Sequence, residues 1–142
     1  MDNLNSVALF QIDKTSKVAK QYSQKVFDNL NLGITVDQWV LLKIIEEHAP
    51  LSQKELAIKS TRDPASITRT LDILEKKGLS QRMPTPGNRR QYNVQLSKKG
   101  RSFVEKNMDT IVRLRNKSLE GFREEECKLL IDMLLRIQGN MK

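Results

Sequence analysis

The sequence predicts a mostly α-helical chain with one small β-hairpin. In most of its length, apolar residues recur every three or four positions, which is typical of amphipathic helices. The period changes to two at Tyr92, Val94 and Leu96, which alternate with polar residues as in a half-buried strand. Residues 79–83 can pair with this strand across a tip at residues 84–88, where Pro86-Gly87 suits the centre of a type II turn.

The first helix is expected over residues 4–31. Its apolar stripe follows helical spacing and consists of Leu9, Ile12, Ala19, Val26 and Leu30. Gly33 is expected to end it, because glycine tolerates the backbone conformation that closes a helix.

Two capping boxes mark the starts of the next two helices. Thr35 and Gln38 form the first box, with Ile34 and Trp39 as a hydrophobic staple, and this helix should run to about His48 before Pro50. Ser52 and Glu55 form the second box, with Leu51 and Leu56 as its staple, and predict a short helix over residues 52–59.

A tight turn at residues 60–62 leads into a fourth helix over residues 64–77. Asp63 is the expected N-cap, Pro64 the first helical residue and Gly78 the stop signal. The helix has one apolar stripe, formed by Ile67, Leu71 and Leu74, and an opposite face with Ala65, Arg69 and Lys76.

Two further helices follow the hairpin. Ser97 caps a helix that extends to about Leu119, and three glutamates at residues 124–126 favour the start of the last helix. The terminal helices, at residues 4–31 and 98–142, keep apolar stripes with few partners in a compact domain. They either pack on each other within one chain or pair with a second chain; we favour pairing, in a homodimer.

This order of elements predicts a winged helix-turn-helix with N- and C-terminal dimerisation helices. We expect residues 1–142 to form a single domain, with residues 34–97 as the DNA-binding unit. Charge supports this interpretation, because residues 52–101 hold twelve Lys/Arg and four Asp/Glu, a local net charge of +8 that equals the net charge of the whole chain. A polyanionic partner explains such a patch, although a solvated basic face is the alternative.

Other classes of protein fit the sequence poorly. We expect no membrane segment, because no apolar run exceeds the four residues 39–42. One cysteine with no signal peptide indicates the cytoplasm. We expect no enzyme activity, cofactor or metal, since His48 is the only histidine and no phosphate-binding glycine motif occurs. RNA binding would favour exposed aromatic residues, and the seven aromatics fall mostly on apolar stripes.

The chain resembles the MarR family of bacterial transcription regulators. The strongest local match is Pro64-Ala65-Ser66-Ile67-Thr68-Arg69, followed by Leu74-Glu75-Lys76-Lys77-Gly78-Leu79. The family's wing signature, Asp-x-Arg and then Leu-Thr after five residues, is present as Asn88-Arg89-Arg90 and Leu96-Ser97. Asn88 therefore replaces the wing aspartate and removes any ion pair that anchors the loop. The resemblance implies a homodimeric repressor or activator whose DNA affinity a small ligand or an oxidant alters.

The candidate DNA contacts lie on the fourth helix, the turn before it and the wing. They are Arg62, Ala65, Ser66, Thr68, Arg69, Lys76, Asn88, Arg89 and Arg90. Ser66, Thr68 and Arg69 suit base edges or phosphates, and Ala65 suits a thymine methyl group. Lys76 suits phosphate or solvent, and Arg62 suits either phosphate or an ion pair with Asp63 or Glu55.

The wing arginines suit the minor groove, and we expect at least one of Arg89 and Arg90 to enter it. Trp39 is expected in the core, with the family's ligand crevice as an alternative position. Cys127 is expected to be an ordinary helix residue rather than an oxidant sensor, because three glutamates precede it.

The predicted function is sequence-specific regulation of transcription, with repression as the favoured outcome. The homodimer is expected to bind a near-palindromic operator in double-stranded DNA and to be released by a small-molecule effector. The alternative function is a winged-helix module that binds another protein and has no specific DNA site.

Overall fold

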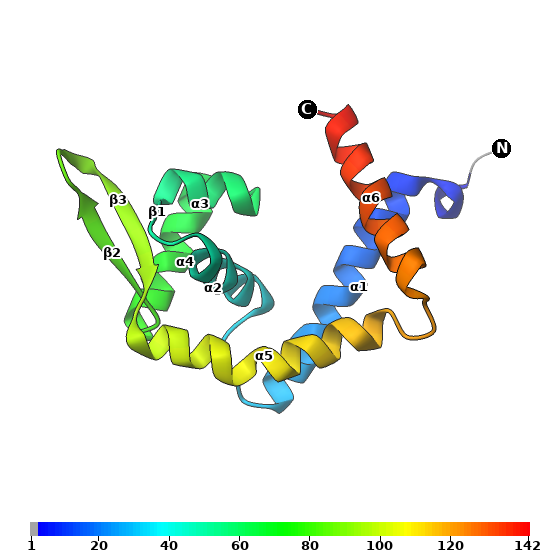
Figure 1. The fold of residues 1–142 in the computed structure, drawn as a ribbon, viewed down its shortest axis with the longest axis horizontal. Helices are drawn as coiled ribbons and strands as arrows, with labels where there is room; N and C mark the ends of the chain where they lie inside the picture. The colour runs from blue at the N-terminus through cyan, green and yellow to red at the C-terminus, as the bar shows by residue number, and fades with distance from the viewer. Residues whose placement is uncertain (1–2) are drawn as a thin grey trace. The chain divides into compact units, whose positions relative to one another are not determined.

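The computed structural model describes residues 3–142, and the side chain of Arg89 lies outside the described part. The helical elements are η1 (Leu4–Ser6, a 3₁₀ turn), α1 (Ala8–Asn29), α2 (Val36–His48), α3 (Gln53–Ser60), α4 (Pro64–Lys76), α5 (Lys98–Ser118) and α6 (Glu124–Asn140). The strands are β1 (Leu51–Ser52), β2 (Ser80–Thr85) and β3 (Asn88–Leu96). Figure 1 shows the hairpin β2–β3 extending beside the cluster of α2, α3 and α4. The predicted fold class, mostly helical with a small β-hairpin wing, is confirmed.

The first long helix is shorter at both ends than the predicted span of residues 4–31. A separate 3₁₀ turn precedes it, and Asn3 caps that turn by accepting a hydrogen bond from the Asn5 amide. At the other end the first left-handed residue is Asn31, with φ 53°, two residues before the predicted Gly33, which is itself left-handed with φ 75°. The Leu32 amide donates to the Phe27 carbonyl at 3.1 Å, the six-to-one bond of a Schellman motif.

The predicted start of α2 is confirmed. The Gln38 amide donates to Thr35 Oγ1 at 3.1 Å, and the Thr35 amide donates to Gln38 Oε1 at 3.0 Å, which completes the capping box. Both staple residues, Ile34 and Trp39, are buried. The helix ends at His48, as predicted.

The second box is made only in part among the described hydrogen bonds: the Glu55 amide donates to Ser52 Oγ at 3.0 Å. The helix α3 runs one residue past its predicted end, and Thr61 then adopts a left-handed conformation with φ 54°. Asp63 caps α4 as predicted, accepting from the Ser66 amide at 3.1 Å. Gly78, with φ 75°, lets the chain leave α4 toward β2.

The sheet has three antiparallel strands in the order β1-β3-β2, so β3 is central. The strand β1 was not predicted, and it pairs Leu51 with Val94. The hairpin tip is narrower than the predicted five residues, because Thr85 pairs with Asn88 across Pro86-Gly87. Gly87 has φ 79°, as the second central position of a type II turn requires.

The core of the winged part lies between α2, α3, α4, the sheet and the start of α5. Its fully buried side chains include Leu41, Leu42, Ile45, Leu56, Ile67, Leu71, Leu74, Val94 and Val104. Gly100 in α5 comes close to the carbonyl oxygen of Leu79, where a Cβ atom would lie 1.9 Å from that oxygen. The start of α5 therefore contacts the backbone that leads into the wing.

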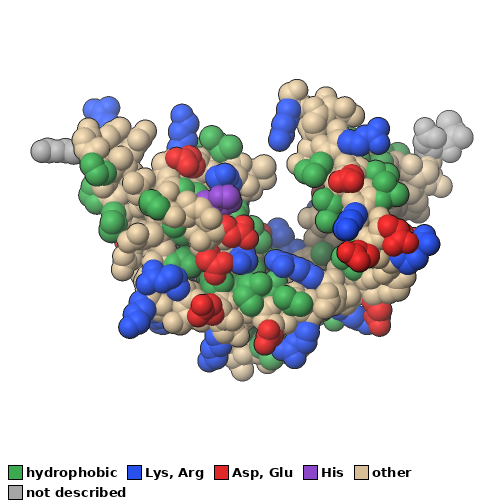
Figure 2. All heavy atoms as spheres, in the orientation of Figure 1, with side chains coloured by type: hydrophobic (Ala, Val, Ile, Leu, Met, Phe, Trp, Pro, Cys, Tyr) green, Lys and Arg blue, Asp and Glu red, His purple; other side chains and the backbone are tan. Residues whose placement is uncertain are grey.

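The chain divides into two compact units, one up to Met108 and one from Asp109 to Lys142. The second unit carries α6, whose exposed apolar residues are Leu129, Leu130, Ile131, Met133 and Leu135. Figure 2 shows hydrophobic side chains on the surface where α6 lies. In the first unit, α1 likewise exposes Leu9, Val18 and Tyr22. Over the described residues, no helix has the length and apolar character needed to cross a membrane.

Candidate nucleic-acid interface

The helix α4 separates an apolar face from a polar one, as the sequence predicts. Ile67, Leu71 and Leu74 are fully buried and fix the helix to the core. On the other side, Ala65 and Thr68 are exposed, together with the cations of Arg69 and Lys76. Neither cation has an ion pair or hydrogen-bond partner in the described part of the chain. The polar face therefore presents two uncompensated positive charges.

Arg62 lies in the turn before α4 and points back onto that helix. Its Nη2 donates to Ser66 Oγ at 2.6 Å and to Thr70 Oγ1 at 3.4 Å, and its Nη1 is buried with no partner in the described structure. The ion pairs with Asp63 or Glu55 that the sequence allowed are not formed among the described residues. Because Ser66 Oγ accepts from Arg62, its own proton stays available for a further acceptor.

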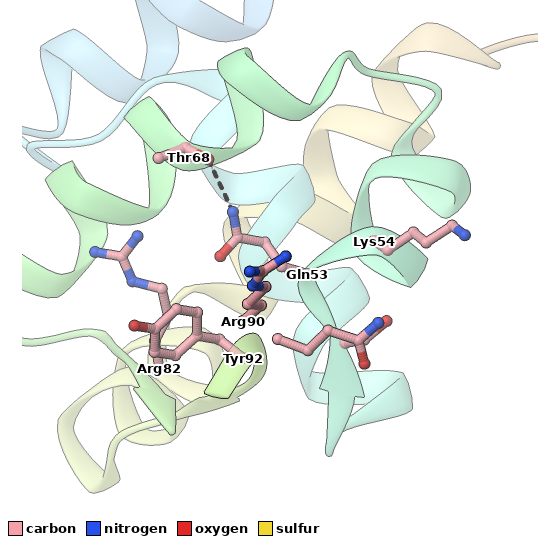
Figure 3. Close-up of a pocket in the computed structure, with 8 residues that line it drawn as sticks. Gln53, Lys54, Thr68, Arg82, Arg90 and Tyr92 are labelled. Atoms are coloured by element: carbon pink, nitrogen blue, oxygen red, sulfur yellow. Dashed lines mark hydrogen bonds between the residues drawn. The ribbon is translucent and has the colours of Figure 1, made fainter. Parts of the chain in front are cut away.

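Thr68 makes two hydrogen bonds within the protein. Its Oγ1 donates to the Pro64 carbonyl at 3.1 Å and accepts from Gln53 Nε2 at 2.8 Å. Gln53 is the first residue of α3, and Figure 3 shows its amide directed toward Thr68. The bond joins the first residue of α3 to the second turn of α4 and fixes the orientation of the Gln53 amide.

The wing tip is closed by Asn88, whose Oδ1 accepts a hydrogen bond from the Arg90 amide at 3.0 Å. This is the local turn that Asn and Asp both support, so replacing aspartate by Asn88 preserves the turn. Arg90 is exposed, and its guanidinium has no partner in the described structure. The sequence also predicts a DNA contact by Arg89, whose side chain is outside the described part of the structure.

A groove of about 330 Å³ lies between α3, α4 and the wing (Figure 3). It is lined by Ser52, Gln53, Lys54, Thr68, Arg82, Arg90, Gln91 and Tyr92. The structure thus brings Thr68 and Arg90, both predicted site residues, to one surface. Prediction from the sequence missed Gln53, Lys54, Arg82 and Tyr92. The second capping box already located Gln53 and Lys54 at a helix start, where backbone amides favour phosphate.

Arg82 on β2 is the most strongly bonded cation of this surface. Its Nε and Nη2 donate to Glu75 Oε2 at 3.0 and 2.7 Å, and its Nη2 also donates to Asp72 Oδ1 at 2.5 Å. Burial alone would lower the pKa of Arg82, but the hydrogen bonds and charges of Asp72 and Glu75 outweigh it and raise that pKa above its usual value. Arg82 therefore stays protonated and tied to α4.

The remaining candidate residues lie away from this groove. Trp39 is 4% exposed and packs its indole against Phe103, with ring centroids 6.5 Å apart, so it is a core residue. It lines neither the groove nor a second cavity of about 280 Å³ beside Pro50 and Arg101. Cys127 is half-buried in the first turn of α6. Residues 3–142 contain no cluster of three or more His, Cys, Asp or Glu suited to a metal ion.

Known proteins share both the sequence pattern and the fold. The sequence pattern of the MarR family matches residues 34–92. The chain is 33% identical over 109 residues to YdgJ, an HTH-type transcriptional regulator of Bacillus subtilis strain 168 whose function is uncharacterized. That match covers 77% of this chain and 66% of YdgJ, slightly less than two thirds of the relative's length.

Solved structures match nearly the whole chain. A MarR-family transcriptional regulator from Rhodococcus sp. RHA1 has a TM-score of 0.86 at 21% identity, covering 96% of both chains. CouR from Rhodococcus jostii RHA1, solved bound to p-coumaroyl-CoA, has a TM-score of 0.84 at 20% identity and covers 96% of this chain and 95% of its own. MepR from S. aureus, solved in a complex with DNA, has a TM-score of 0.82 at 20% identity and covers 94% and 98%.

Proposed function

The chain belongs to the MarR family, and from that premise we propose that it regulates transcription by binding double-stranded DNA. The observation that carries the proposal is the groove surface formed by α3, α4 and the wing. Lys54, Arg69 and Arg90 project from these three elements, and none of the three side chains has a partner in the described structure. Cations left free on one surface suit a phosphate backbone.

The proposed binding mode inserts α4 into the major groove. Arg69 reads a base edge, with guanine as the preferred partner of an arginine fork, and Ser66 donates its free hydroxyl proton to an acceptor. Ala65 contacts a thymine methyl group. Lys76 binds phosphate near the end of the helix. Arg62 holds the Ser66 hydroxyl in place through its hydrogen bond to Ser66 Oγ.

The wing lies over the neighbouring minor groove in this proposal. Asn88 holds the tip, and Arg90, with Arg89 as its neighbour, supplies the positive charge that a narrow minor groove attracts. The DNA complex of MepR, a protein with the same fold, supports the proposal that this fold binds DNA here.

We further propose that the protein acts as a homodimer and represses transcription. The exposed apolar residues of α6, such as Leu129, Ile131 and Leu135, support an interface between two copies. Two reading helices about 34 Å apart would then contact a near-palindromic operator. We also propose that a small-molecule effector binds the protein and releases it from DNA. The structure of the similar protein CouR with bound p-coumaroyl-CoA supports this part of the proposal.

The test begins with selection of bound fragments from the source genome. Binding of the selected operator is then measured from about 50 to 200 mM salt, where affinity should fall by on the order of 10³-fold or more. Arg69→Ala should weaken specific binding by about 1–3 kcal/mol per half-site. Sedimentation at micromolar concentration should give a dimer. A monomer that binds no fragment, or binding that is insensitive to salt, would instead favour a protein-interaction module.

A further inference from the structure

The DNA-facing side of α4 carries acidic residues as well as basic ones. Asp72 follows Arg69 by three positions and precedes Lys76 by four, so all three share one face of the helix. Glu75 lies beside this face, and both carboxylates are partly exposed, with side-chain exposures of 50% and 42%. Two negative charges at this place repel a phosphate backbone.

Arg82 reaches these carboxylates from a different element. It comes from β2, where it pairs with the buried Val94 of the central strand, so its backbone is fixed by the sheet. Its guanidinium donates the three hydrogen bonds described above, to the carboxylates of Asp72 and Glu75. The Arg82 side chain is only 21% exposed. The contact joins the second half of α4 to the base of the wing.

We propose that Arg82 is a positioning residue for DNA binding, which fixes the wing against α4 and compensates the carboxylates of Asp72 and Glu75. This inference rests on the proposed DNA-binding function. It states that one ion-pair cluster, Arg82 with Asp72 and Glu75, controls the affinity of this surface for DNA. Arg82 acts through the two acids, and not by its own contact with a phosphate. A partly exposed ion pair contributes little to folding, so its loss affects DNA binding more than stability.

The experiment compares four proteins on the selected operator: wild type, Arg82→Ala, Arg82→Lys, and the triple variant R82A/D72N/E75Q. Arg82→Ala should bind at least about tenfold more weakly, because two uncompensated carboxylates then face the phosphates. The triple variant should recover part of that loss, since it lacks both carboxylates but also lacks the contact that fixes the wing. Arg82→Lys should fall between, because lysine keeps the charge but has no fork to hold two acids.

Three results would overturn the inference. The first is operator binding by Arg82→Ala that equals wild type. The second is a triple variant that binds no better than Arg82→Ala, because the carboxylates of Asp72 and Glu75 would then have no effect on DNA binding. The third is a loss of binding matched by a large drop in the melting temperature of both Arg82 variants, which would indicate a purely structural role. Failure of the proposed function is distinguishable, because wild type itself would then bind no operator, and both proposals would fall.

Discussion

Gly100→Ala should destabilise the protein, although alanine is the better helix former. A Cβ atom at Gly100 would lie 1.9 Å from the Leu79 carbonyl oxygen and 2.9 Å from its carbon, whereas real Cβ contacts essentially never fall below 3.0 Å. The backbone must therefore separate by about 1 Å. The Leu79 carbonyl accepts from the Ser97 amide at 3.1 Å, and the Leu79 amide donates to the Leu74 carbonyl at 2.9 Å. Any shift strains the junction of α4, β2 and α5.

The magnitude follows from two opposing terms. Overpacking of a rigid site lowers the free energy of unfolding by up to about 3 kcal/mol. Exchanging glycine for alanine within a helix raises it by up to about 1 kcal/mol. The net loss is about 2 kcal/mol, which corresponds to a fall in melting temperature of roughly 7 °C at this chain length. Thermal unfolding followed by circular dichroism at one fixed protein concentration measures it.

Gly139→Ala is the matched control, because Gly139 is also helical but a Cβ atom added there would meet nothing within 4 Å. That variant should melt at or slightly above the wild-type temperature. Equal melting temperatures for Gly100→Ala and Gly139→Ala would contradict this prediction, since the close contact with Leu79 would then cost no stability.

Three further substitutions test single features. Asp63→Ala removes the N-cap of α4 and should cost about 1 kcal/mol in urea unfolding, whereas Asp63→Ser should keep most of the stability. Asn88→Asp keeps the turn at the wing tip but adds a negative charge beside Arg90, so it should weaken binding to non-specific DNA while operator binding changes little; equal losses on both would contradict this. Cys127→Ser should leave DNA binding and its response to peroxide unchanged, and loss of a peroxide response in that variant would identify Cys127 as an oxidant sensor.

Features set by neighbouring residues could be predicted from the sequence. The capping box of Thr35 and Gln38 and the N-cap of Asp63 depend on side chains within three positions of the backbone that they bond, so the pattern alone located them. The buried stripe of α4 followed from helical periodicity for the same reason. The end of α1 was predicted too late, because Asn31, a weaker signal than Gly33, already adopts the left-handed conformation that closes the helix, and Gly33 lies two residues beyond it.

Features that depend on distant segments could not be predicted in this way. The strand β1 has only two residues, Leu51 and Ser52, and its pairing partner Val94 lies more than forty positions away. Nothing in the local pattern separates such a strand from a helix cap. Arg82 was missed for the same reason, because its partners on α4 come into reach only when the hairpin folds back over that helix.

Thr68 illustrates how tertiary contacts change the role of a correctly located residue. Its position on the polar face predicted a contact with bases or phosphates, and phosphate oxygens require a hydrogen-bond donor. In the structure the Thr68 proton is used by the Pro64 carbonyl, and the same oxygen accepts from Gln53. Thr68 therefore has acceptor capacity left but no proton to donate, whereas the Gln53 amide keeps its oxygen and one N–H. An amide with one donor and one acceptor free matches the edge of adenine, so in the proposed DNA complex Gln53, which Thr68 orients, is better suited than Thr68 to contact a base.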